Sequence, residues 1–173
     1  MKNKYLLTIF IIFFTFCFII LFKGLKNPNT YQPEFNQNRV LSDFTSTEFF
    51  SDEKIKLSTI VTDEKYYLIN IWASWCIPCR KEHKFLIKLQ KQEKIKLIGI
   101  NYKDKFKNAK NFLNDFENPY QINFKDKNGI VSIELGAYGV PETFLINKNL
   151  QIIKKIIGPI NPKTYNEIIE IIK

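Results

Sequence analysis

An uncharged strand-like segment leads directly into a cysteine pair and then into a helix. Residues 66–72 (YYLINIW) are aromatic and β-branched, the composition of a buried β-strand. Cys76 and Cys79 follow in the sequence ASWCIPC, and from residue 77 to about 92 apolar side chains recur at helical spacing among basic ones. The chain must therefore adopt a fold in which a buried strand ends at the N-terminus of a helix that carries two cysteines.

Strand and helix patterns alternate along the following sequence. The alternation predicts an α/β sandwich with a central mixed sheet flanked by helices, in which the last two strands form an antiparallel hairpin. Phe112, Leu113 and Phe116 are expected to face inward. The expected strands are at 95–102, 122–124, 142–147 and 150–157, with short strands in 39–57; the expected helices are at 106–116, 130–135 and 162–172.

The N-terminal segment is apolar over residues 5–22, which contain no charge and have two lysines on each side. Eighteen such residues can span a bilayer core as a helix. No small-x-small cleavage site follows, so we expect an uncleaved anchor in residues 1–26. Two prolines and polar residues predict a linker at 27–38, and the folded domain is expected at 39–173. The flanking charges do not determine the orientation of the anchor.

The net charge of +9 does not indicate a nucleic-acid partner. It arises from 26 Lys and Arg against 17 Asp and Glu, but the lysines are scattered and no basic motif accompanies them. Three cysteines are too few for a disulfide-stapled scaffold. Cys17 lies in the apolar segment, where a small packing residue is the ordinary interpretation.

The C-x-x-C spacing at a helix start suits dithiol chemistry. The positive end of the helix dipole stabilises a thiolate on the first sulfur, and Pro78 is tolerated in the first turn. We therefore expect Cys76 to be the exposed attacking thiolate. Cys79, one turn into the helix, is expected to resolve the mixed disulfide.

Other uses of the cysteine pair are less consistent with the sequence. A zinc site needs four ligands, and His83 is the single histidine available to join the two cysteines. A covalent haem site needs C-x-x-C-H, but position 80 is Arg80. We expect neither a metal nor another cofactor. The spacing alone leaves a plain structural disulfide open.

The context of the cysteines resembles the thioredoxin superfamily. The resemblance is carried by residues 72–80 (WASWCIPCR) and by residues 139–143 (GVPET), which follow at the start of a strand. It implies that Pro141 has a cis peptide bond and lies beside the cysteines. It also implies that the backbone of Val140 pairs with an incoming peptide strand.

Nearly the whole domain resembles the membrane-anchored thiol:disulfide interchange proteins of cytochrome c maturation, the DsbE/CcmG type. The matching segments are 72–83, 99–104 (GINYKD), 118–120 (NPY) and 138–146 (YGVPETFLI), together with the anchor. The resemblance implies a single-pass protein of the bacterial inner membrane with its catalytic domain on the periplasmic side.

The resemblance also implies the partners. The chain would reduce the disulfide of apocytochrome c, directly or through a thiol chaperone of the haem-ligation system, and a membrane electron donor protein would reduce the chain. No charged or histidine residue separates the cysteines, which favours a reductant over an oxidant. A general extracytoplasmic disulfide reductant and a non-redox thioredoxin-fold module that holds haem-ligation partners remain alternatives.

Three further side chains are candidates for supporting roles. Thioredoxins place a buried Asp six residues before the first active cysteine, but here that position is Asn70, which cannot act as a base. Glu82 and Glu142 are the candidate carboxylates for proton transfer, although Glu82 could equally be a solvated charge on its helix. Trp75 is a candidate for lining the site, and His83 is expected to be structural or on the surface.

Overall fold

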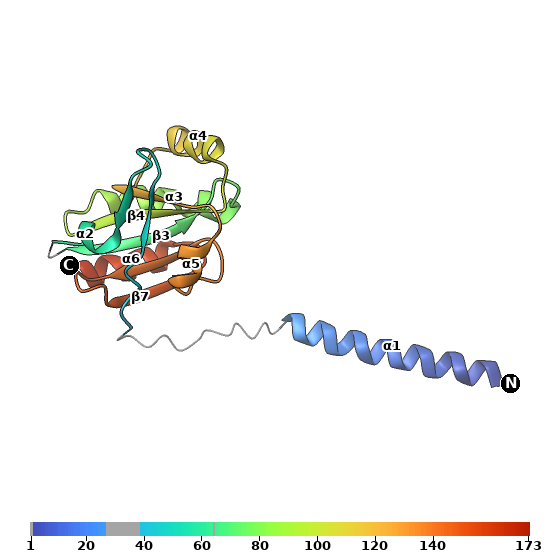
Figure 1. The fold of residues 1–173 in the computed structure, drawn as a ribbon. Coiled ribbons are helices and arrows are strands. Elements are labelled where there is room, and N and C mark those ends of the chain that lie inside the picture. Colours follow the sequence, from blue (N-terminus) through green and yellow to red (C-terminus); the bar gives the residue numbers. More distant parts are fainter. Residues whose placement is uncertain (1, 27–38, 64) are drawn as a thin grey trace. The chain divides into compact units, whose positions relative to one another are not determined.

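The structure, a computed structural model, describes residues 2–26, 39–63 and 65–173 (Figure 1). The chain divides into two compact units, residues 1–35 and 36–173. The first contains α1 (Lys2–Lys26), of which Lys4–Gly24 is long and apolar enough to cross a membrane. This helix includes the whole uncharged segment predicted as the anchor. The linker predicted at 27–38 lies outside the described residues.

The second unit contains seven strands and five helices within the described residues. Their order along the chain can be followed by colour and label in Figure 1. The elements are β1 (Thr45–Glu48), β2 (Lys54–Lys56), α2 (Leu57–Ile60), β3 (Tyr66–Trp72), α3 (Ile77–Gln90), β4 (Ile95–Tyr102), α4 (Phe106–Phe116), β5 (Ile122–Asp126), α5 (Ile130–Glu134), β6 (Glu142–Ile146), β7 (Ile152–Ile157) and α6 (Pro162–Ile172).

One mixed sheet runs through the domain in the order β2-β1-β5-β4-β3-β6-β7. The strands β3, β4 and β5 are parallel, and β6 runs antiparallel between β3 and β7. The register pairs Ile71 of β3 with Glu142 of β6. The carboxyl end of β3, from which the cysteine loop emerges, therefore lies beside the start of β6 and the proline that precedes it.

Buried side chains lie on both faces of the sheet. Successive residues of β3 point to opposite faces, and nearly all of them are buried. Leu68 and Trp72 pack with buried residues of α3, α4 and α6 in one cluster, which also contains both active-site cysteines. Ile69 and Ile71 point to the other face and are fully buried. A central strand buried on both faces provides a rigid base for the loop at its end.

The predicted mixed sheet and its flanking helices are confirmed, and four elements have the predicted bounds: β3, β4, α4 and α6. Residues 39–57 form β1 and β2 and continue into the short helix α2. The prediction that Phe116 faces the core is wrong, because this residue is 47% exposed. It is the last residue of α4, and its ring lies 5.9 Å from the guanidinium carbon of Arg80, so it covers the flank of α3 instead of entering the core.

Candidate active site

A disulfide joins Cys76 and Cys79 at the N-terminus of α3. Cys76 is the N-cap residue, and the backbone N–H of Cys79 donates to its sulfur at 3.1 Å. Pro78 lies in the first turn, where a missing N–H leaves no intrahelical bond broken. The sulfur of Cys76 thus occupies the position at which a helix stabilises negative charge.

Both cysteines are covered to the same extent in the oxidised protein. Each is 3% exposed, so the predicted exposure of Cys76 alone is not seen in this state. Trp75 and Ile77, which flank Cys76, are 55% and 67% exposed and place apolar surface beside the disulfide.

Ser74 fixes the loop between β3 and the cysteines through hydrogen bonds on both sides. Its backbone N–H and its hydroxyl donate to the carboxylate of Asp104, at 2.5 and 2.9 Å. Its carbonyl accepts from the guanidinium of Arg80, with the shorter distance 3.0 Å. The indole N–H of Trp75 donates to the carbonyl of Lys103 at 3.2 Å. The loop that presents Cys76 is therefore tied to both α3 and the end of β4.

Glu82 is a fully buried carboxyl group below the active site. Its Oε1 accepts from the side-chain amide of Asn70 at 2.9 Å, and its Oε2 accepts from the backbone N–H of Ile160 at 2.7 Å. The alternative that Glu82 is a solvated charge on the surface of its helix is wrong, since the residue is 0% exposed. Burial raises the pKa of Glu82 to about 7, although both hydrogen bonds oppose that shift. A group with such a pKa can take up and release protons at neutral pH.

Asn70 is held in one orientation by its neighbours. The hydroxyl of Tyr120 donates to Asn70 Oδ1 at 2.7 Å, so the amide NH₂ must face Glu82 and the hydroxyl of Thr143. Complete burial, together with the charge of Glu82, raises the pKa of Tyr120 well above its ordinary value. The side chain at the position where thioredoxins carry an acid is thus an amide that donates to the buried carboxyl group of Glu82.

The peptide bond between Val140 and Pro141 is cis, as the resemblance implied. Val140 packs against the core cluster that contains Cys76 and Cys79. Glu142 follows the proline and is 2% exposed. Its Oε1 accepts from two backbone N–H groups of the preceding loop, and its Oε2 lies 2.9 Å from the ammonium of Lys155.

His83 lies on the flank of α3 that faces α4. Its Nε2 is 2.8 Å from the carbonyl of Glu117, and its ring packs edge-on against Phe112. Burial lowers the pKa of His83 below its ordinary value. These contacts connect α3 to the end of α4 and agree with a structural role for His83. Among the described residues, no three His, Cys, Asp or Glu side chains group closely enough to hold a metal ion.

Four residues that contact the site machinery were not singled out from the sequence: Ser74, Asp104, Tyr120 and Lys155. Asp104 could have been found, because it follows β4 and the ends of parallel neighbours meet at one edge of the sheet. Tyr120 lies in the segment 118–120 (NPY) that carries the family resemblance, which marked the position without giving it a role, whereas a lysine in a terminal strand, such as Lys155, is ordinary.

Comparison with known proteins agrees with this site. The sequence matches the Redoxin family over residues 34–169. It is 46% identical over 100 residues to the thiol:disulfide interchange protein DsbE of Vibrio cholerae, an alignment that covers 58% of this chain and 54% of that protein. It is 33% identical over 171 residues to DsbE of Escherichia coli, with coverage of 96% and 92%. The chain belongs to the DsbE family of thiol:disulfide interchange proteins.

Solved structures place the DsbE-family chain in the thioredoxin fold. The thioredoxin domain of a thiol-disulfide oxidoreductase from Bacteroides vulgatus superposes with a TM-score of 0.68 at 18% identity, covering 81% of this chain and all of that one. A DsbF homologue from Corynebacterium diphtheriae superposes with a TM-score of 0.68 at 21% identity, covering 83% of this chain and 95% of that one. The protein is thus a thioredoxin-like thiol:disulfide oxidoreductase with a C-x-x-C cysteine pair.

Proposed function

We propose that the chain is a membrane-anchored dithiol reductant that delivers two electrons to the disulfide of an apocytochrome c C-x-x-C-H site, or of a thiol chaperone that serves it. The observation that carries the proposal is the Cys76–Cys79 disulfide at the N-terminus of α3, with Val140 packed against the same cluster. Relatives named DsbE, and one from Rhizobium leguminosarum named CycY at 44% identity over 95 residues, support the assignment to cytochrome c maturation.

The reaction follows from the positions of the two sulfurs. In the reduced enzyme, the Cys76 thiolate attacks one sulfur of the substrate disulfide, whose other sulfur leaves as a thiolate. Cys79 then loses its proton, attacks Cys76 and releases the second substrate thiolate. The substrate gains two electrons, and the enzyme is left with the disulfide seen in the structure.

Glu82 is the proposed acceptor of the Cys79 proton. Glu82 is buried on the same helix, three residues after Cys79, and its pKa of about 7 lies near that of a thiol in a C-x-x-C pair. Glu142 is proposed to orient the loop before the cis-proline, because its carboxylate is occupied by that loop and by Lys155. Trp75 and Val140 are proposed to contact the substrate peptide.

The helix α1 is the proposed membrane anchor, and the catalytic domain is proposed to face the periplasm. The support is the length and apolar composition of Lys4–Gly24 and the DsbE-family membership. Substrate disulfides form and persist in oxidising compartments outside the cytoplasm, which agrees with a domain on the periplasmic side. A membrane electron donor protein is the proposed source of reducing equivalents.

Single-turnover reduction of a peptide tests the function. The full chain in detergent micelles would be reduced, freed of reductant and mixed with an oxidised C-x-x-C-H peptide. The wild type should release two peptide thiols, Cys79→Ser should stop at the mixed disulfide, and Cys76→Ser should transfer nothing. Retained transfer by Cys76→Ser would refute the assignment of the attacking sulfur. The reduction potential of the Cys76–Cys79 pair should lie near about −270 mV if the chain is a reductant. A value near about −120 mV would contradict the proposed direction of electron transfer.

A further inference from the structure

Lys155 of β7 is a buried cation beside the loop that leads to the cis-proline. Its side chain is 5% exposed, and that of its partner Glu142 is 2% exposed. The ammonium lies 2.9 Å from Glu142 Oε2 and donates to the carbonyl of Gly136 at 2.8 Å. It also lies 4.4 Å from the ring centre of Tyr138 and 5.2 Å from that of Phe144. Because withdrawing an ammonium from water is unfavourable unless it is paired, these contacts determine where the side chain lies.

The pair of charges fixes the loop at successive points. Lys155 holds the carbonyl of Gly136 at the start of the loop. Glu142 accepts from the backbone N–H of Tyr138 at 2.6 Å and from that of Gly139 at 2.9 Å. Lys155 therefore acts on the loop directly, and also through the carboxylate that it faces.

Val140 is left with its backbone unpaired between these fixed points. The carbonyl of Pro141 accepts from the backbone N–H of Gly158 at 3.0 Å, which fixes the residue after Val140. Within the described part of the chain, neither the N–H nor the carbonyl of Val140 forms a hydrogen bond. A loop held on both sides of one unpaired residue offers that residue to another extended chain.

We propose that Lys155 is a positioning residue for disulfide exchange, which orients Glu142 and residues 136–141 so that Val140 can pair with the backbone of a disulfide-bearing peptide. This inference rests on the proposed function and identifies what sets its peptide-binding edge. Loss of the ammonium should weaken peptide binding and leave the sulfur chemistry unchanged.

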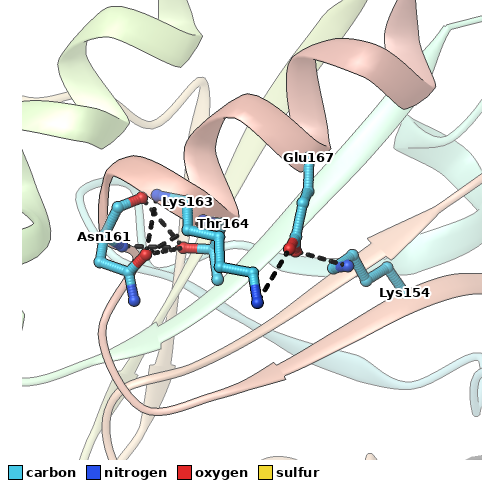
Figure 2. Close-up of polar contacts among 5 residues, drawn as sticks. All are labelled: Lys154, Asn161, Lys163, Thr164 and Glu167. Carbon is cyan, nitrogen blue, oxygen red and sulfur yellow. Dashed lines mark hydrogen bonds and ion pairs between the residues drawn. The ribbon is translucent and has the colours of Figure 1, made fainter.

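The neighbouring Lys154 provides a matched control. It lies on the same strand, but its side chain points to the other face and pairs with Glu167 of α6 at 2.8 Å (Figure 2). These two side chains are 29% and 33% exposed, so the pair lies at the surface, where ion pairs contribute little. Lys154→Met removes the same charge from the same strand without touching the loop.

The test measures single-turnover rates of the pre-reduced full-length chain in detergent micelles against the concentration of an oxidised C-x-x-C-H peptide, where kcat denotes the limiting rate constant and KM the half-saturating peptide concentration. Lys155→Met should raise KM by about tenfold, the effect of losing one charge-assisted hydrogen bond, while kcat changes by less than about threefold. Lys155→Arg should restore KM to within about threefold, since a guanidinium can make both contacts. Lys154→Met should match the wild type. Reduction of 5,5′-dithiobis(2-nitrobenzoate), which has no peptide backbone, should change by less than about twofold in Lys155→Met.

An unchanged KM in Lys155→Met would overturn the proposal, as would an equal loss toward the peptide and the aromatic disulfide. If Lys155→Met does not fold, the double variant Lys155→Met/Glu142→Gln removes both buried charges and should still show the raised KM. A normal KM in that variant would also overturn the proposal. A wild-type chain that reduces the aromatic disulfide but not the peptide would instead refute the proposed substrate.

Discussion

The buried Glu82 should make the stability of the domain fall as the pH rises. A carboxyl group whose pKa is raised from 4.5 in the unfolded chain to about 7 in the folded one binds its proton more tightly when folded. Its contribution favours folding below pH 4.5 and is lost as the pH rises through 7. Between pH 5 and pH 8 the linkage amounts to roughly 2–3 kcal/mol of unfolding free energy.

Glu82→Gln removes this titration without changing the size of the side chain. The amide of Gln has an oxygen that can accept from one of the two donors, Asn70 and Ile160, but it presents NH₂ to the other. The unfolding free energy of the variant should therefore be lower by roughly 1 kcal/mol at all pH values. The unfolding free energy of the wild type minus that of Glu82→Gln should therefore fall by roughly 2–3 kcal/mol from pH 5 to pH 8. The contribution of His83 is common to both proteins and cancels in the difference.

Urea unfolding of the oxidised full-length chain in detergent, followed by tryptophan fluorescence, measures this difference. Both tryptophans lie in the catalytic domain, and Trp72 is buried against Tyr120 and Phe112, so the signal reports that domain. Glu93→Gln, at an exposed glutamate just after α3, should give a curve parallel to the wild type. Parallel curves for the wild type and Glu82→Gln would refute a raised pKa at Glu82.

Three further substitutions probe the polar groups around the cysteines. Asn70→Asp places a second carboxylate against Glu82 and should destabilise the oxidised protein at pH 8 by roughly 2 kcal/mol or more, with a smaller effect at pH 5, as measured by urea midpoints. Asp104→Ala leaves the N–H and hydroxyl of Ser74 without their acceptor and should lower the unfolding free energy by about 1–3 kcal/mol. An unchanged urea midpoint would contradict this and would show that water replaces the carboxylate. Since the pKa of His83 is lowered, the unfolding free energy of the wild type minus that of His83→Gln should fall as the pH drops below 6.5, because the Glu82 contribution is common to both proteins and cancels; a difference that does not change with pH would contradict it.

The local sequence pattern determined the secondary structure around the site. The bounds of β3, β4, α4 and α6 follow from hydrophobic periodicity, which depends on neighbours a few residues apart. The C-x-x-C spacing likewise brings the two sulfurs within bonding reach on one helical turn. Prediction failed for Phe116, because apolar periodicity identifies a face of a helix but not how far the core extends beneath its last residue.

The tertiary structure decided which polar groups are buried and what each one faces. Glu82 has the same local sequence as a solvated helix residue, yet it is fully buried, and the backbone N–H of Ile160, 78 positions later, donates to it. Glu142 and Lys155 meet across β6 and β7, and Asp104 reaches Ser74 from the loop that follows β4. Burial and pairing depend on which distant segments share a layer of the fold. The sequence by itself therefore located the cysteine pair, whereas the folded chain determined which polar and charged side chains surround it.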